Sequence, residues 1–477
     1  MSILDEKKPH QRFFEALTKI PHGSENEQAI SDFLVEFAKT RKRKVIQDAA
    51  NNVIVYKEAS RGYEDHPAVM LQAHIDMVNE KSSDSTHNFE TDPLDIYVED
   101  GFVKARGTTL GADDGAGAAY IMAVLDDDTL MHPRINAVFT TGEESTMNGA
   151  FQIDPKLLDA RRLINLDCID EGISTTASSG GMDVLFHRKL NWINNNQNCC
   201  QLCVSGLYGG HSGGDIHLER GNALKIIARV LHVLQKQNTI MLSSLSGGFK
   251  VNAIPHTAET VFAYEGDFSH LSSIVKETAA AIQKELAYSD RELQIEIRQI
   301  EPVKEVVDQN DSEAIVKLLY LHPTGLRHKS EHMDGLTVAS ENIGVVTLDR
   351  MHFEAAVSMR GALDSYVKDM QDESHTLGAL LGFECEDANW YPCWEYVENS
   401  ALRSIMKEVY HDMYGTDLIV EAVHGGLECG ILKDKLPDLD IVTLGMDMYD
   451  VHTPMEKLDL ASFDRSYHFL CEFLSKL

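Results

Sequence analysis

Residues able to hold a metal ion follow several apolar, strand-like segments of the chain. The segments are QAHIDM (72–77), GADDGAG (111–117), TTGEES (140–145), NLDC (165–168) and MYDVHTPME (448–456). An open α/β sheet binds ligands where its strands end, so these residues can gather in one crevice. Because the candidates are imidazoles and carboxylates without a thiolate partner, they indicate a divalent metal site of the zinc-hydrolase type.

His74 and Asp76 form the first candidate pair. A lone histidine is more often structural than a ligand, but a carboxylate two residues later lies on the same face of a strand and can orient the imidazole. Asp113 and Asp114 lie between glycines, which let a carboxylate approach closely, as a bridging ligand must. The same acids could instead cap the helix that follows, so both roles stay open.

Glu143 and Glu144 are adjacent acids after an apolar segment, and by themselves they could be a solvated strand end. If Glu144 holds a metal, Glu143 is placed to take a proton from metal-bound water and to deliver it to the leaving amine. Asp167 ends the segment INLD, where it could be a ligand or a turn cap. His452 is uninformative when taken alone.

The elements that must position these residues can be predicted from hydrophobic periodicity. Residues 5–44 contain two amphipathic helices, and Ser24 with Glu27 resembles a capping box for the second. Short β-rich segments then alternate with a helix over residues 115–127, which indicates an α/β sheet of parallel character. The β-rich segments cover residues 51–57, 68–77, 102–108, 135–141 and 162–167.

Residues 185–394 have a different order of predicted elements, in which a strand-helix-strand pattern occurs twice. No linker rich in Gly, Ser or Pro separates this block from its neighbours. We therefore expect an inserted α+β domain between two halves of a first domain, residues 1–184 and 395–477.

Composition limits the possible partners. The net charge of -32 at pH 7 opposes binding to nucleic acid or to anionic membranes, because both need a basic face. The first residues lack the apolar segment of a signal peptide, and no run of eighteen apolar residues occurs. Eight cysteines without regular pairing suit a reducing compartment, so we expect a cytoplasmic protein in which Cys199, Cys200 and Cys203 are structural.

Taken together, the ordered motifs H-x-D, ADDG, EE, a lone Asp and a late His before TP-x-E resemble the two-zinc metallopeptidase family of aminoacylases, carnosinases, tripeptidases and aminoacyl-histidine dipeptidases. The likeness covers nearly the whole chain. The strings LQAHIDMV, KARGTTLGAD, GGHSGGDIH, NAIP and HGGLECG are similar to the aminoacyl-histidine (Xaa-His) dipeptidase branch. The resemblance implies a catalytic α/β domain with a mixed, largely parallel sheet flanked by helices, and an inserted α+β lid domain.

The resemblance also implies a role for each motif residue. One Zn2+ would be held by His74 and Asp167 and a second by Glu144 and His452, with Asp113 bridging them; Co2+ or Mn2+ could substitute. Asp76 would orient His74, and Glu143 would be the general base and acid for a hydroxide between the metals. His424 is the nearest competitor to His452 for the last ligand position.

In the lid, His211 matches the family's oxyanion-stabilising histidine, although it could instead stabilise its glycine-rich turn. Asn252 and Arg360 match positions that face the substrate, and Arg360 could clamp a C-terminal carboxylate or form a structural salt bridge. Gly425, Gly426 and Glu428 resemble the segment beside the substrate.

The implied activity is hydrolysis of dipeptides, preferentially Xaa-His such as Ala-His and carnosine-like compounds. A tripeptidase, an N-acyl-amino-acid amidohydrolase and a metal-binding protein without catalysis are the alternatives. The expected partner is a small peptide, with neither nucleic acid nor membrane. Because the inserted block is about twice a single lid, we expect His211 to act on its own chain's metals, so that a homodimer is not required to complete the active site.

Overall fold

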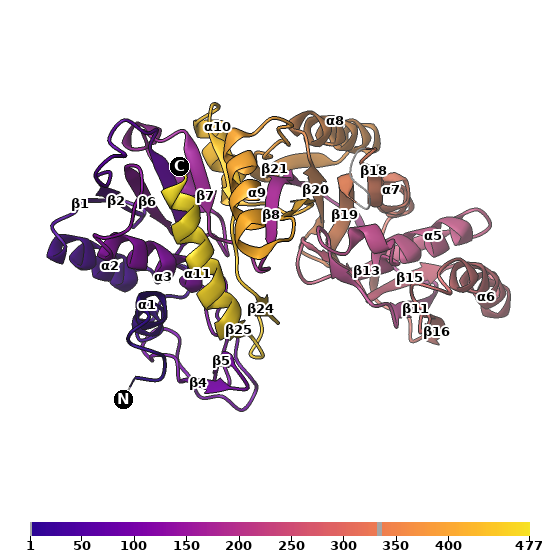
Figure 1. Ribbon diagram of the computed structural model, residues 1–477. Coiled ribbons are helices and arrows are strands. Elements are labelled where there is room, and N and C mark those ends of the chain that lie inside the picture. Colours follow the sequence, from indigo (N-terminus) through magenta and orange to yellow (C-terminus); the bar gives the residue numbers. More distant parts are fainter. Residues whose placement is uncertain (1, 332–335) are drawn as a thin grey trace. The chain divides into compact units, whose positions relative to one another are not determined.

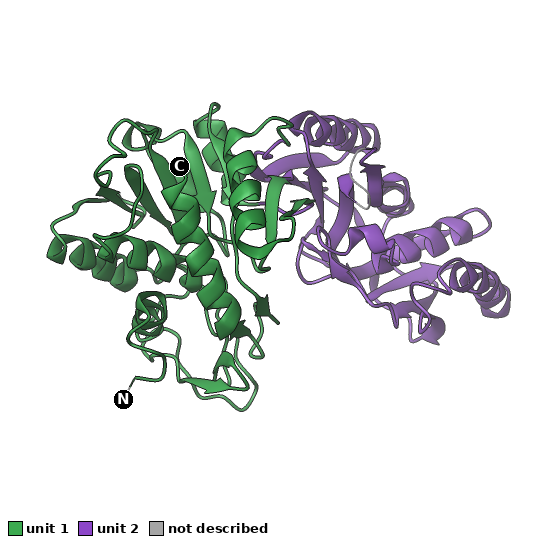
Figure 2. Ribbon diagram, viewed as in Figure 1, with its two compact units in different colours: residues 1–177, 396–422, 427–477 green, residues 178–395, 423–426 purple. Residues whose placement is uncertain are grey.

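The computed structural model describes residues 2–331 and 336–477 and divides into two compact units (Figures 1 and 2). Unit 1 contains residues 1–177, 396–422 and 427–477, and unit 2 contains residues 178–395 and 423–426. Strand β9 (Gly180–His187) spans the boundary expected between residues 184 and 185. Because β9 pairs with its neighbour β20 (Phe353–Gly361) from Gly180 onward, the whole strand belongs to unit 2.

Unit 1 is built on a six-stranded sheet with the order β1-β2-β6-β3-β7-β23. Strands β6, β3, β7 and β23 run parallel, whereas β1 and β2 are antiparallel additions, so the expectation of a mixed, largely parallel sheet is confirmed. Every residue of the central strands β3 and β6 is buried, as in parallel sheets covered on both faces. The bounds are β1 (Lys44–Gln47), β2 (Val53–Lys57), β3 (Val69–His74), β6 (Ile135–Thr140), β7 (Arg162–Asn165) and β23 (Asp440–Thr443).

Helices and small sheets complete unit 1. The helices are α1 (Pro9–Leu17), α2 (Gln28–Thr40), α3 (Ala112–Asp126), α4 (Asn148–Gln152), α9 (Ala401–Tyr414), α10 (Glu428–Lys435) and α11 (Leu460–Ser475). A four-stranded sheet contains β4 (Ile96–Glu99), β5 (Phe102–Ala105), β24 (Met448–Tyr449) and β25 (Lys457–Asp459), and β8 (Ile173–Ser178) pairs with β22 (Ile419–Val423).

Helix α3 is the central helix of unit 1, because residues 114–125 are all buried. Its Tyr120 ring stacks on Phe463 of α11 at a centroid distance of 4.9 Å, and the Tyr120 hydroxyl donates a hydrogen bond to the Phe463 carbonyl. A helix that is apolar on all sides belongs in a core. This packing fixes the helix that begins at the GADDGAG motif.

The predicted capping box of α2 is wrong. Glu27 is the N-cap residue and makes no side-chain cap, while Ser24 Oγ donates a 2.8 Å hydrogen bond to Asp76 Oδ2. The Ser24 hydroxyl therefore binds a residue that is distant in sequence and does not cap the helix.

Unit 2 is built on a nine-stranded sheet with the order β16-β11-β15-β13-β19-β20-β9-β21, to which β18 adds beside β19. Its two halves meet where β13 and β19 pair over three residues of each strand. The remaining strands of the sheet are β11 (Asn198–Ser205), β13 (Ile240–Gly247), β15 (Ala258–Tyr264), β16 (Gln294–Ile300), β18 (Gly325–Lys329), β19 (Thr337–Leu348) and β21 (Glu384–Tyr391).

Four helices and two short strand pairs accompany this sheet. They are α5 (Ala223–Gln235), α6 (Phe268–Glu285), α7 (Gln309–Leu321) and α8 (Asp364–Leu381), with the pairs β10 (Trp192–Asn194) and β17 (Glu305–Val307), and β12 (Gly210–His211) and β14 (Ala253–Ile254). Cys199 and Cys200 are buried in β11 and all eight cysteines are free. Among the described residues, no helix is long and apolar enough to cross a bilayer.

Unit 2 contains a buried histidine that makes stability depend on pH. His322 Nδ1 donates to the Pro323 carbonyl at 2.8 Å and its Nε2 accepts from Ser374 Oγ at 2.9 Å, so the neutral ring satisfies both contacts. Burial lowers the pKa of His322 from 6.5 to about 4. Between these values the unfolded chain binds the extra proton, so stability is lost as pH falls from 6.5 toward about 4, by up to about 3 kcal/mol.

We expect this pH dependence to be visible in unfolding measurements. Denaturant unfolding of the wild type and of His322→Asn between pH 4 and 7 measures it. The variant is expected to start less stable and to lose less stability on acidification. Equal losses in the two proteins would contradict the assignment.

Candidate metal centre

His74, Asp113 and Glu144 come together in unit 1, with one ligand atom from each lying within 4.8 Å of the others. His74 ends β3, Glu144 lies four residues after the end of β6, and Asp113 lies at the start of α3. Because β3 and β6 are parallel neighbours, their carboxyl ends meet at one edge of the sheet. The fold thus assembles three of the five residues expected as ligands.

Asp113 faces two histidines from distant segments. Its Oδ1 lies 3.1 Å from His74 Nε2, and its Oδ2 lies 3.2 Å from His452 Nε2. His452 Nε2 is also 2.8 Å from Glu144 Oε1. One carboxylate that offers an oxygen to each imidazole has the arrangement required of a bridging ligand.

His424, the competing candidate, lies in unit 2, where its Nε2 is 2.7 Å from Ser340 Oγ. Within unit 1, His452 is the histidine that lies beside Asp113 together with His74. Asp167 follows β7, the other parallel neighbour of β3. Burial and the adjacent charge of Asp113 raise the pKa of Asp167 to about 7.

The charges of this cluster fit a bound cation. Asp113, Glu144 and Asp167 are carboxylates that share one small volume with two imidazoles. Hydrogen bonds to Asp113 and Glu144 raise the pKa of His452 to about 10, so protons supply positive charge when no metal does. Oxygen and imidazole nitrogen donors without thiolate suit Zn2+, Co2+ or Mn2+.

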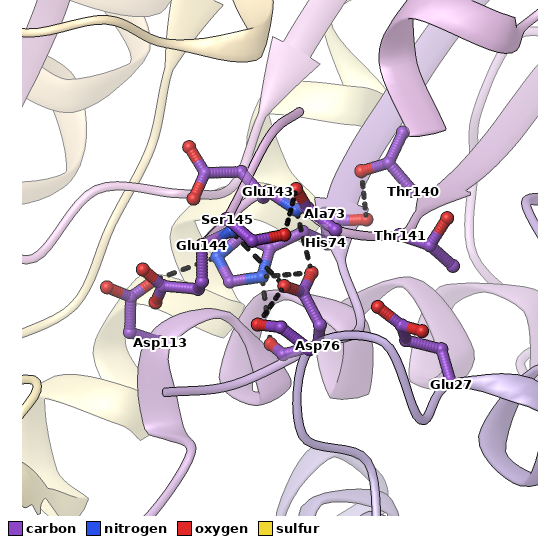
Figure 3. Close-up of polar contacts among 12 residues, drawn as sticks. Glu27, Ala73, His74, Asp76, Asp113, Thr140, Thr141, Glu143, Glu144 and Ser145 are labelled. Atoms are coloured by element: carbon purple, nitrogen blue, oxygen red, sulfur yellow. Dashed lines mark hydrogen bonds and ion pairs between the residues drawn. The ribbon is translucent and has the colours of Figure 1, made fainter. Parts of the chain in front are cut away.

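Asp76 organises the segments that carry the ligands (Figure 3). Its Oδ1 accepts a 3.0 Å hydrogen bond from the Glu143 backbone N–H, and its Oδ2 accepts one of 3.2 Å from that of Glu144. His74 Nδ1 lies 3.5 Å from Asp76 Oδ1 and 3.0 Å from the Asp76 carbonyl. Because that carbonyl can only accept, Nδ1 carries the proton and Nε2 is free to bind a metal.

Glu143 and Glu144 have different surroundings although they are adjacent. Figure 3 shows the Glu144 side chain beside Asp113, with the Glu143 carboxyl lying apart from these two. Burial raises the pKa of Glu143 well above its ordinary value, and the negative charges of Asp167 and Glu144 add to this effect. A carboxyl whose pKa moves toward neutrality suits proton transfer.

Asp114 takes the capping role that the sequence left open for this pair. The backbone of Asp113 and Asp114 is not helical, so the regular part of α3 begins at Gly115, and Asp114 Oδ1 accepts a 3.0 Å hydrogen bond from the Gly117 N–H in its first regular turn. The side chain is fully buried, and burial raises its pKa well above the usual value for aspartate. Asp113 thus faces His74 and His452, whereas Asp114 binds the start of the helix.

In unit 2, the His211 ring is held by its own turn. Its Nδ1 accepts hydrogen bonds from the N–H groups of Gly213 at 3.2 Å and Gly214 at 3.0 Å. Because a backbone N–H can only donate, Nδ1 is unprotonated and Nε2 carries the proton of the neutral ring. His211 is therefore both a turn-stabilising residue and an Nε2–H donor.

The other residues expected to face the substrate have mixed environments. Asn252 is exposed, and its carbonyl accepts a 2.8 Å hydrogen bond from Ser212 N. Arg360 is buried and donates from Nη1 to Tyr391 Oη at 2.8 Å, while its Nε has no partner among the described residues. Among the described residues Arg360 makes no direct salt bridge, although its charge partly offsets the effect of burial on the pKa of Asp183.

The three candidate residues of the HGGLECG segment, Gly425, Gly426 and Glu428, have different surroundings. A Cβ on Gly425 would meet no atom within 4 Å, so no contact among the described residues requires glycine there, and Gly426 is half-buried. The Glu428 carboxyl is fully buried in unit 1, near the charges of His74 and Asp167, and its place beside the substrate stays a prediction. Its Oε2 accepts hydrogen bonds from Thr140 Oγ1 at 2.6 Å and Gln72 Nε2 at 2.7 Å, which direct it into the interior.

Sequence comparison gives full-length matches. The profile of Peptidase family M20/M25/M40 matches residues 70–476. The chain is 33% identical over 485 residues to the cytosol non-specific dipeptidase of Escherichia coli (strain K12), a match that covers 100% of this chain and 99% of the relative.

Solved structures have the same fold. The aminoacylhistidine dipeptidase of Vibrio alginolyticus matches with a TM-score of 0.88 and 30% identity over 99% of this chain and 98% of that chain. The Saccharomyces cerevisiae dipeptidase Dug1p matches with a TM-score of 0.54 and 15% identity over 98% and 96% of the chains, a likeness of fold alone.

Proposed function

This chain belongs to peptidase family M20/M25/M40, and we propose that it is a metal-dependent dipeptidase that prefers Xaa-His substrates such as Ala-His. The observation that carries the proposal is full-length similarity to two dipeptidases, one of them an aminoacylhistidine dipeptidase with a TM-score of 0.88. The E. coli relative is described as cytosolic, which agrees with the cytoplasmic location that we propose.

The proposed cofactor is a pair of Zn2+ ions, with Co2+ or Mn2+ as substitutes. His74 and Asp167 would hold one ion, Glu144 and His452 the other, with Asp113 between them. The two Asp113 oxygens, each about one hydrogen-bond length from a different histidine, support this division. Such ions supply Lewis acidity that lowers the pKa of water and polarises a peptide carbonyl.

Glu143 is the proposed proton carrier. Its raised pKa supports removal of a proton from the attacking water and delivery of that proton to the leaving amine. Asp76 keeps the Glu143–Glu144 backbone in position through two N–H groups. His211 Nε2–H is the proposed donor to the oxyanion, since its Nδ1 is already occupied. We propose that it acts within its own chain.

A substrate panel tests this function against its alternatives. Turnover of Ala-His, Gly-Gly-Gly and N-acetyl-Met is measured with the same metal-loaded protein. We expect Ala-His to have the highest kcat/KM. A preference for Gly-Gly-Gly would indicate a tripeptidase, and a preference for N-acetyl-Met an amidohydrolase.

The proposed carboxylate clamp gives a prediction about Arg360. Amidating the C-terminus of Ala-His should lower kcat/KM of the wild type by about 10-fold to 100-fold, because a charge-assisted hydrogen bond is lost. In Arg360→Met the free and amidated substrates should be cleaved at similar rates.

Tyr391→Phe is the matched control, since it removes the hydrogen-bond partner of Arg360 and keeps the charge. This control should keep the preference for the free carboxylate. An undiminished preference in Arg360→Met would contradict the clamp.

A further inference from the structure

Glu456 is a buried carboxylate that accepts hydrogen bonds from three consecutive backbone N–H groups. Glu456 is 3% exposed to solvent. Oε2 accepts from Leu110 N at 2.7 Å and from Gly111 N at 3.2 Å, and Oε1 accepts from Ala112 N at 2.8 Å. Both oxygens are therefore occupied, which makes Glu456 a poor candidate for a metal ligand.

These contacts join the two segments that carry Asp113 and His452. Residues 110–112 lead directly into Asp113, and Glu456 lies four residues after His452. His452 itself is 48% exposed at its side chain and has a left-handed backbone with φ 63°. The loop lies between the paired strands β24 and β25. Within it, Thr453 Oγ1 donates to the Asp450 carbonyl at 2.7 Å and accepts from Met455 N at 3.1 Å, and Glu456 N donates to the Thr453 carbonyl at 3.1 Å.

We propose that Glu456 is a positioning residue that sets the separation between Asp113 and His452, and thereby the affinity for the metal that His452 holds. This inference rests on the proposed metal site. This role requires a side chain whose two oxygens can both accept hydrogen bonds from the backbone N–H groups of residues 110–112. A glutamine at position 456 offers one oxygen and directs an NH2 group at backbone N–H donors, which leaves at least one buried N–H unpaired.

A second buried glutamate that accepts hydrogen bonds from backbone N–H groups serves as the control for a general loss of stability; unlike Glu456, it also binds Ser2 Oγ and Lys19 Nζ. Glu15 is also 3% exposed, and its Oε2 accepts from Ile3 N at 3.0 Å and Leu4 N at 2.9 Å. It lies on α1, and its carboxyl accepts hydrogen bonds from residues 2–4 and from Lys19, none of which belongs to a segment that carries a proposed ligand. Glu15→Gln is therefore the matched control for Glu456→Gln.

The experiment measures Co2+ binding to metal-free proteins by calorimetry and by the visible d–d spectrum of the Co2+ form. We expect Glu456→Gln to weaken binding of at least one Co2+ by about 10-fold to 100-fold, the usual cost of losing a group that supports ligands, and to alter the d–d bands. Glu15→Gln should bind Co2+ and absorb as the wild type does. Glu456→Asp keeps the charge with a shorter reach, and it should also bind more weakly.

The inference would be overturned if folded Glu456→Gln bound Co2+ with the affinity and spectrum of the wild type. If Glu456→Gln does not fold, the same result in Glu456→Asp would overturn it. Equal weakening in Glu15→Gln would also overturn it, because the effect would then be general. Failure of the wild type to bind Co2+ would instead contradict the proposed metal site and, with it, this role of Glu456.

Discussion

Replacing Glu143 with Gln is expected to lower kcat for Ala-His by about 10²-fold to 10⁴-fold while the metal content stays near that of the wild type. The amide has nearly the same shape but cannot accept the proton of the attacking water. The Glu143 backbone N–H, which Asp76 holds at 3.0 Å, is unchanged by the substitution. Steady-state kinetics together with metal analysis of the same preparation measure both quantities.

Glu144→Gln is the companion variant, because it changes the adjacent carboxylate that lies 2.8 Å from His452. It should lose metal as well as activity. If Glu143→Gln loses metal and Glu144→Gln keeps it, the roles assigned to the two residues are exchanged.

Replacing Asp113 with Asn should release both metals and abolish measurable turnover. Each carboxylate oxygen lies near a different histidine, and the amide nitrogen of asparagine cannot coordinate a cation in place of the second oxygen. Metal content after dialysis against metal-free buffer measures the effect.

Asp114→Asn is the control from the same motif. Asparagine at this buried position keeps an oxygen that can accept from Gly117 N and carries no charge that burial would disfavour. This variant should keep its metals. Full metal content in Asp113→Asn would contradict the bridging role.

The sequence was most informative where apolar strands end in chemically active residues. His74, Glu144 and Asp167 follow strands β3, β6 and β7, which are adjacent and parallel, so the prediction that their side chains share one edge required only strand recognition. The helix over residues 115–127 was predictable because Gly115 to Leu125 is an apolar segment with helical length, and it forms most of α3.

Contacts between distant segments were not predictable. The spacing of Ser24 and Glu27 fits a capping box, but the hydroxyl of Ser24 binds Asp76, which lies 52 residues away. Glu428 likewise has hydrogen-bond partners, Thr140 and Gln72, that lie far from it in the sequence. Local spacing describes what a side chain can reach along the chain, and these two residues are fixed by partners brought near only by folding.

The choice between Asp113 and Asp114 shows the same limit. Both have glycine neighbours and both precede a helix, so composition and spacing are equal for the two. The family resemblance favoured Asp113 as the ligand, and the folded chain shows the physical difference: His74 and His452 approach Asp113, while Gly117 N approaches Asp114.

The most direct test is hydrolysis of Ala-His by chelator-treated protein as Zn2+ is added back. The proposed metal-dependent dipeptidase predicts no measurable turnover in the metal-free protein and a rise to a plateau at two Zn2+ per chain. Undiminished turnover by protein that metal analysis finds free of metal would contradict the central claim.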